Sequence, residues 1–273
     1  WPVADSDTVY VGNSDGMFFA LERPKTKTGT FDVAWQEPAG AQSPYQPVVM
    51  DDTILFTTVS GDAVCLDRES GTQQWTTEIA HSLGTTIAVR NGIVVTGSAH
   101  GRVTGLDHRT GEKRWHHDET ASAHMTLIGD DVIIISDTVT RRSISTGTRQ
   151  AEVDLGTHPD QTRRPVVADD TLVVGIEDGN GGGDLYGIRD SEIVWHTSSD
   201  SEHPVGLATD GSRVFVTFTD GRLTAIAPGD GTTEWELNME TKRTAPPTVV
   251  GDVVIVSGRI ETRATVKAVS KQA

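Results

Sequence analysis

Cysteine and long apolar runs are scarce in this sequence. Cys65 is the single cysteine among 273 residues. One cysteine excludes an internal disulfide framework and a zinc site built from several thiolates, and it leaves the redox compartment open. Apolar residues nowhere continue for the roughly 18 positions that a membrane-spanning helix needs. We therefore expect no transmembrane segment in this chain.

Positive charge is also scarce. The sequence has 23 Lys and Arg against 39 Asp and Glu, which gives a formal charge of −16, and only 6 of the basic residues are lysines. This balance excludes a basic footprint for nucleic acid and disfavours an anionic membrane surface. The acidity fits either a cationic partner or adaptation to concentrated salt, in which ions screen the self-repulsion of the carboxylates. We favour salt adaptation, because the acidic residues are spread along the whole chain.

Tryptophan recurs at a fixed interval. Five of the six tryptophans share steps of 40 residues, with one position skipped, and they are Trp35, Trp75, Trp115, Trp195 and Trp235. Leu155 occupies the skipped position. A fixed period of this length is typical of repeat architectures, in which each repeat is one supersecondary unit.

Each interval reads as four short strands. Bursts of Val, Ile and Leu alternate with Thr, Ser and Gly at the period of two that is typical of half-buried strands. Glycines that suit tight hairpins follow the second strand at Gly16, Gly61, Gly101 and Gly221, and the third strand at Gly71, Gly111, Gly147 and Gly231. The predicted units are 2–35, 47–75, 86–115, 126–153, 165–195, 205–235 and 248–273.

Four short antiparallel strands per unit predict β-propeller blades. We therefore predict an all-β fold over residues 1–273, a single seven-bladed β-propeller of four-stranded antiparallel blades, or eight blades if the sequence is a piece of a longer chain. The last unit stops before its Trp-bearing strand, so that blade either has three strands or is completed by a strand from elsewhere. The sequence starts with Trp1 instead of Met, and we expect an upstream signal or anchor.

One repeated motif points to a family. It reads Cys65-Leu-Asp-Arg-Glu-Ser-Gly71-Thr-Gln-Gln-Trp75 in one unit and Gly105-Leu-Asp-His-Arg-Thr-Gly111-Glu-Lys-Arg-Trp115 in the next. It resembles the tryptophan-docking repeat of quinoprotein dehydrogenases and their PQQ-like relatives. The resemblance implies that each Trp packs on the neighbouring blade beside a turn glycine. It assigns a structural role to Trp35, Trp75, Trp115, Trp195 and Trp235 and to Gly71, Gly111 and Gly231.

The resemblance leaves two kinds of function open. Quinoprotein dehydrogenases oxidise alcohols or sugars with PQQ and Ca²⁺, are much longer than this chain, and often contain an adjacent cysteine pair. Non-enzymatic relatives resemble the outer-membrane assembly lipoprotein and sensor ectodomains, which use the ring for binding. We predict a non-catalytic scaffold for a protein or peptide partner, outside the cytoplasm, with neither PQQ nor calcium. The alternatives are a PQQ-dependent dehydrogenase and a small-ligand sensor.

Cys65 is interpreted as a buried core residue.

One face of the predicted ring concentrates the few basic residues. The loops and hairpins expected around the channel mouth carry His124, Arg141, Arg142, Arg163, Arg164, His203, Lys242 and Arg243. Arginine binds carboxylate and phosphate groups in a bidentate manner, so this mouth predicts an acidic peptide or an anionic ligand. In the alternative interpretation, these cations only pair with the nearby Asp160, Glu202 and Glu240.

One acidic segment suggests a cation site. Residues 177–184 form a glycine-rich hairpin with four oxygen-bearing side chains, which is chemically plausible for Ca²⁺. Their spacing differs from that of the twelve-residue calcium loop. We therefore interpret the segment as a solvated acidic turn and predict no metal site.

Overall fold

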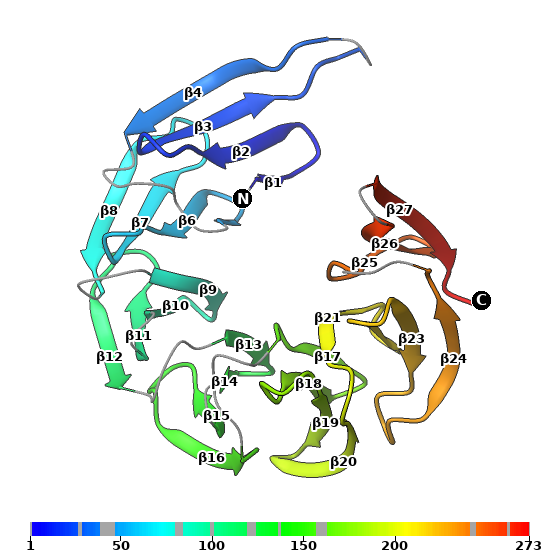
Figure 1. The fold of residues 1–273 in the computed structure, drawn as a ribbon. Coiled ribbons are helices and arrows are strands. Elements are labelled where there is room, and N and C mark those ends of the chain that lie inside the picture. Colours follow the sequence, from blue (N-terminus) through cyan, green and yellow to red (C-terminus); the bar gives the residue numbers. More distant parts are fainter. Residues whose placement is uncertain are drawn as a thin grey trace. The chain divides into compact units, whose positions relative to one another are not determined.

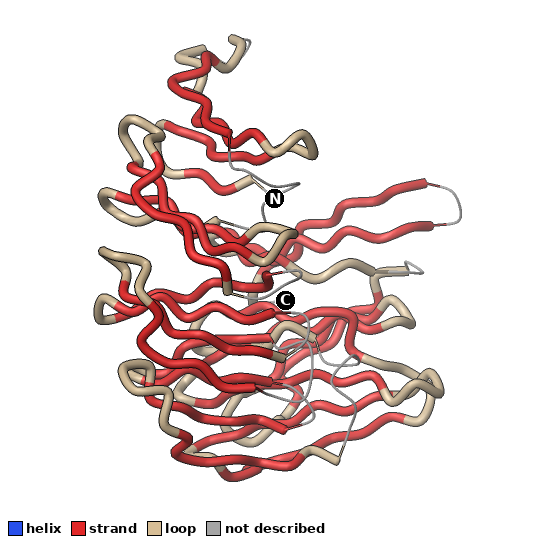
Figure 2. The backbone as a smooth tube through the Cα atoms, turned by 90° about the vertical axis from the view of Figure 1, so that its left-hand side faces the viewer, coloured by secondary structure: helices blue, strands red, loops and turns tan. Residues whose placement is uncertain are grey.

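A computed structural model describes residues 2–26, 29–38, 47–79, 84–98, 101–118, 124–135, 138–156, 163–240, 244–260 and 263–272. Every regular element within these residues is a strand (Figure 2). The strands form seven separate sheets, and each sheet is built from consecutive strands of the chain (Figure 1). The prediction of an all-β, seven-bladed β-propeller is confirmed.

The first four sheets have four strands each, in sequential order. Their strands are β1 (Val3–Ala4), β2 (Thr8–Gly12), β3 (Met17–Glu22), β4 (Asp32–Pro38), β5 (Val48–Val49), β6 (Thr53–Thr57), β7 (Asp62–Asp67), β8 (Gln73–Glu78), β9 (Gly84–Arg90), β10 (Ile93–Ser98), β11 (Arg102–Asp107), β12 (Lys113–Asp118), β13 (His124–Ile128), β14 (Asp131–Ile135), β15 (Thr138–Ser143) and β16 (Arg149–Asp154).

The fifth and sixth sheets again have four strands, whereas the described residues of the seventh sheet form three. These strands are β17 (Val166–Ala168), β18 (Thr171–Glu177), β19 (Gly183–Arg189), β20 (Glu192–Ser199), β21 (Pro204–Thr209), β22 (Val214–Phe218), β23 (Arg222–Ile226), β24 (Thr233–Asn238), β25 (Thr248–Val250), β26 (Val253–Ile260) and β27 (Arg263–Ser270).

The chain divides into two compact units. The first contains residues 1–136 and 142–150, and the second contains residues 137–141 and 151–273. The first three sheets belong entirely to the first unit, and the fifth to seventh sheets belong to the second.

The turns between strands follow the predicted chemistry. Positive φ angles of 71–76° occur at the outer-hairpin glycines Gly71, Gly111, Gly147 and Gly231. The fifth sheet has no glycine at this turn, and Asp190 (φ 51°) and Ser191 (φ 66°) adopt the left-handed conformation instead. Asp is among the residues that tolerate this region, since its short polar side chain hydrogen-bonds locally.

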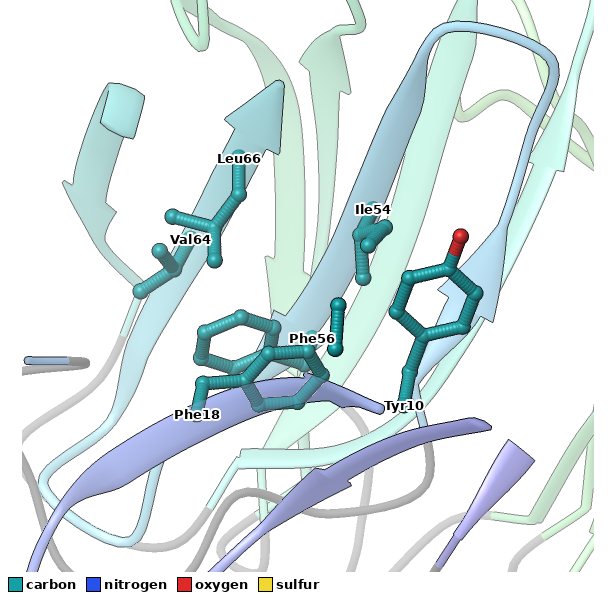
Figure 3. Close-up of a cluster of buried hydrophobic side chains, with 7 residues drawn as sticks. Tyr10, Phe18, Ile54, Phe56, Val64 and Leu66 are labelled. Carbon is teal, nitrogen blue, oxygen red and sulfur yellow. The ribbon is translucent and has the colours of Figure 1, made fainter. Parts of the chain in front are cut away.

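Apolar side chains fill the space between neighbouring sheets within each unit. Between the first and second sheets the cluster contains Tyr10, Phe18, Ile54, Phe56, Val64 and Leu66 (Figure 3). The rings of Phe18 and Phe56 are stacked, with centroids 4.6 Å apart and planes at 8°. Burial of one such side chain contributes about 1.5–3 kcal/mol. Strand β6 is buried on both faces, because Ile54 and Phe56 pack in this cluster and Leu55 packs in the next one.

Candidate binding surface

A tryptophan on the outermost strand connects each of five sheets to the next. The indole Nε1 donates a hydrogen bond of 2.7–3.1 Å to a backbone carbonyl of the following sheet or of the residues beside it. The pairs are Trp35 to Arg68, Trp75 to His108, Trp115 to Ile144, Trp195 to Pro228 and Trp235 to Lys271. These rings are structural spacers, and the bond of each Nε1 satisfies the only polar group of its side chain.

Small residues make room for the rings on both sides. Within its own sheet, each Trp lies opposite a small residue of the third strand, and these pairs include Cys65 with Trp75 and Gly105 with Trp115. In the following sheet, the rings of Trp35, Trp75, Trp115 and Trp195 lie against the outer-turn glycine. A Cβ atom on Gly111 would come within 2.6 Å of Trp75, and one on Gly147 within 2.6 Å of Trp115.

Leu155 replaces the missing tryptophan with a different contact. Its side chain is buried, and its carbonyl accepts a hydrogen bond of 3.4 Å from the hydroxyl of Tyr186. The Tyr186 ring stacks on His196 with centroids 4.4 Å apart, and His196 Nε2 lies 2.8 Å from Asp184 Oδ1. At this position the fifth sheet therefore supplies the hydrogen-bond donor, whereas elsewhere the preceding sheet supplies it through its indole.

Two of the predicted channel-mouth residues meet in the second unit. Arg163 donates to Pro204 O at 2.9 Å and forms an ion pair with Glu177 Oε2. His203 Nε2 lies 3.6 Å from the same carboxylate oxygen, and the His203 side chain is 17% exposed. The guanidinium of Arg163 is therefore engaged within the protein. Glu177 was absent from the predicted pairing partners.

A second arginine lies beside this group. Arg222 Nη2 is 2.5 Å from Glu202 Oε2, and its Nη1 is 3.1 Å from Glu236 Oε2. Asp220 lies 3.3 Å from Nε, and the guanidinium carbon stands 4.5 Å from the centroid of the Phe218 ring. Three carboxylates around one guanidinium leave this cluster with a negative balance. Glu202 was predicted to pair with the mouth cations, whereas it pairs with Arg222.

A cleft of about 350 Å³ opens between the fifth and sixth sheets. Its apolar lining includes Leu185, Phe218 and Ile226, and its polar lining includes Glu202 and Arg222. Hydroxyl groups from the end of β20 complete the wall. Such a mixture suits a peptide side chain or a small polar group, because apolar walls exclude water while a few polar groups set orientation.

The other predicted mouth residues are dispersed. Arg141 and Arg142 lie within strand β15, not in a hairpin, and Arg142 is 8% exposed and donates to Gly147 O at 2.9 Å. Their predicted place was wrong, because no turn glycine marks the change from β14 to β15. His124 begins β13, and Arg164 is exposed. Lys242 and Arg243 lie outside the described residues, as does Asp160.

The carboxylates of the acidic hairpin are all engaged within the protein. Glu177 pairs with Arg163, and Asp184 pairs with His196. Asp178 Oδ1 accepts hydrogen bonds from the amides of Asn180 and Gly182, at 2.7 and 3.0 Å. The described part of the chain contains no group of three or more His, Cys, Asp or Glu side chains placed to hold a metal ion.

Cys65 behaves as a small core residue. It is fully buried, opposite Trp75, and burial raises the pKa of its thiol to about 11. It has no cysteine neighbour with which to form the pair found beside the quinone in dehydrogenases of the related family.

Comparison with known proteins identifies the family. A family model described as "Outer membrane protein assembly factor BamB" matches residues 26–140 and 136–271. The chain belongs to this family. The outer membrane protein assembly factor BamB of Yersinia pestis is 25% identical over 259 residues, which is 92% of this chain. The chain spans 57% of the length of that relative.

Solved structures agree on the fold. The BamB family member of Moraxella catarrhalis superposes with a TM-score of 0.64 at 19% identity, covering 92% of this chain and 79% of that one. The computationally designed Ika8 protein gives 0.70 at 14% identity, covering 98% and 95%. Quinohemoprotein alcohol dehydrogenase ADHIIG of Pseudomonas putida HK5 gives 0.69 at 15% identity, covering 94% and 62%. Among the described residues, no helix is long and apolar enough to cross a membrane.

Proposed function

We propose that this chain is a non-catalytic β-propeller scaffold that binds a protein or peptide partner outside the cytoplasm. The match of the BamB family model to nearly the whole chain carries this proposal. The relative from Yersinia pestis is named an outer membrane protein assembly factor, and we extend that role in protein assembly to this chain. A protein partner is therefore expected.

The chemistry of the described side chains supports a scaffold. The recurring motif residues are used in packing: five indole rings connect sheets, and Cys65 is buried with a raised pKa. The arginines near the predicted mouth are paired with carboxylates, as Arg163 is with Glu177 and Arg222 with Glu202.

A quinone-dependent dehydrogenase is the alternative function. The fold of ADHIIG favours it, although a likeness at 15% identity shows the fold alone. The test is to incubate the chain with PQQ and Ca²⁺ and to follow dye reduction with alcohols and sugars, beside an active quinoprotein dehydrogenase. We expect no turnover above the protein-free control. Clear turnover would establish the enzyme in place of the scaffold.

The basic mouth is a second part of the proposal. We expect an acidic peptide segment to contact Arg164 near the Arg163–Glu177 pair. The variant Arg164→Glu should weaken retention of the natural partner, whereas Arg109→Glu, in an exposed turn of the third sheet, should not. Arg68 would be a poor control, because it bonds to Asp5, Tyr10 and two backbone carbonyls. Equal retention by both variants would remove the mouth from the binding surface.

A further inference from the structure

The connection between β3 and β4 is longer than its counterparts. β3 ends at Glu22 and β4 begins at Asp32, whereas in the second sheet β7 ends at Asp67 and β8 begins at Gln73. The longer connection carries Arg23, Lys25 and Lys27, and so holds two of the six lysines of the chain. Lys27 lies outside the described residues. Positive charge is thus concentrated on one hairpin of a chain with a formal charge of −16.

The described cations of this connection differ from six arginines elsewhere in the chain. Arg23 and Lys25 are exposed, and within the described part of the chain neither forms an ion pair with a carboxylate. By contrast, carboxylates pair with Arg68, Arg102, Arg114, Arg163, Arg213 and Arg222. An unpaired cation keeps its full attraction for an external anion, because no internal partner has to be displaced.

Apolar side chains are exposed beside these cations. Phe31 is 50% exposed and Val33 is 55% exposed. Side chains two residues apart in an extended chain point to the same side, so these two form one small apolar surface. Val33 lies on β4, the edge strand of the first sheet (Figure 1). An edge strand presents unpaired backbone N–H and C=O groups that can pair with another extended chain.

We propose that this basic hairpin, consisting of Arg23, Lys25, Phe31 and Val33, docks an extended acidic segment of a protein partner. The proposal rests on the binding function proposed above and adds a surface in the first unit to the basic mouth around Arg164. Carboxylates of the segment meet Arg23 and Lys25, an apolar side chain covers Phe31 and Val33, and the backbone of the segment pairs with the free edge of β4. An anionic bilayer fits less well, because a charge of −16 repels it and two apolar side chains anchor weakly.

The test measures binding of a fluorescent peptide that alternates Asp or Glu with Val or Phe, by anisotropy with the full chain. The variant Arg23→Glu with Lys25→Glu should weaken binding by about tenfold or more. The control Arg90→Glu with Arg109→Glu makes the same change in net charge at two exposed positions of the third sheet, and should leave affinity within about twofold. The variant Phe31→Ser with Val33→Thr should weaken binding by about fivefold or more.

Three results would overturn the proposal. The first is no binding of the peptide by the wild-type chain. The second is an equal loss of peptide affinity in the basic-hairpin variant and in its control, which would show that the peptide is attracted by net charge and not by a defined site. The third is sedimentation of the chain with phosphatidylglycerol vesicles that depends on Arg23 and Lys25 while the peptide does not bind. All of the substituted side chains are exposed, and circular dichroism of each variant verifies the fold.

The outcome is separable from that of the proposed function. If the basic-hairpin variant still retains the natural partner from cell-envelope extract as the wild type does, docking occurs elsewhere and the scaffold function stands. If the wild-type chain retains no protein, the scaffold function itself fails.

Discussion

The turn glycine of the repeat must adopt a positive φ angle and must leave space for an indole ring. Substitution of Gly111 and of Gly92 by alanine separates these two requirements. Gly111 has a φ of 73°, and a Cβ atom there would lie 2.6 Å from Trp75 Cδ2 and 2.9 Å from Thr77 Oγ1. Gly92 has nearly the same φ, 74°, but a Cβ atom there would meet nothing within 4 Å. Gly92→Ala therefore changes the backbone preference alone, and Gly111→Ala changes both the preference and the packing.

The magnitudes follow from the contacts. The left-handed conformation costs alanine about 1–2 kcal/mol, and the less flexible unfolded chain offsets roughly 0.4–1 kcal/mol of this. We expect Gly92→Ala to lower the free energy of unfolding by about 1 kcal/mol. At Gly111 the indole must also move, which costs about 1–3 kcal/mol of packing and weakens the 2.9 Å bond from Trp75 Nε1 to His108 O, worth about 1 kcal/mol. The expected loss is about 3–4 kcal/mol.

Urea unfolding followed by far-ultraviolet circular dichroism measures both losses. Trp75→Leu in the Gly111→Ala background should restore part of the stability, because the smaller side chain leaves space for the new methyl group. The reasoning is refuted if Gly111→Ala costs no more than Gly92→Ala, since the indole would then not be held against the turn.

Three further predictions concern charge and reactivity. The Cys65 thiol should stay unmodified by a thiol reagent at pH 8 in the folded chain and react on unfolding, because burial raises its pKa to about 11. Rapid modification of the native chain would contradict the place of Cys65 in the core. For Asp5, partial burial raises the pKa, but hydrogen bonds from the amides of Asp7 and Thr8 and from Arg68 outweigh it and lower the pKa from 3.8 to about 2. This carboxylate therefore stabilises the fold above about pH 4 and loses that effect as the pH falls towards 2. The variant Asp5→Asn should accordingly reduce the fall in the free energy of unfolding at acid pH. An unchanged acid limb of the stability–pH curve would disprove this role of Asp5. The unfolding midpoint should rise from low to molar KCl because ions screen a charge of −16, and a flat or falling midpoint would exclude salt adaptation.

The sequence predicts the packing of neighbouring sheets in unusual detail. The spacing of Trp75 and Gly111 is set by the length of one repeat, and both residues have conformational requirements that few other residues meet. The repeat pattern in the sequence therefore predicts the contact between these two residues in the folded chain. From the sequence, Leu155 is only the position where a tryptophan is missing. Its hydrogen-bond partner Tyr186 lies on the third strand of the next sheet, and the 40-residue period of the tryptophans does not predict a contact there.

The candidate binding surface was predicted less well, for two physical reasons. The hairpin between β14 and β15 lacks the glycine found at Gly61 or Gly221, so Arg142 was placed in a turn although it is buried in a strand. The pairing of Arg163 with Glu177 depends on how the residues before β17 fold back onto the end of β18, which sequence distance does not reveal.

The basic hairpin escaped notice for a related reason. Its charge stands out in the sequence, but the exposure of Phe31 and Val33 depends on the position of β4 at the edge of its sheet. Edge position is a property of the folded sheet and not of the strand sequence.

The most direct measurement of the central claim is capture of a partner by the chain itself. The tagged protein, cross-linked in its own cell envelope at native salt, is isolated under denaturing conditions and its attached proteins are quantified beside an equally acidic unrelated protein. The scaffold account predicts one protein or a small set of proteins attached in near-stoichiometric amounts and absent from the control. Attachment of no protein beyond those on the acidic control would contradict it.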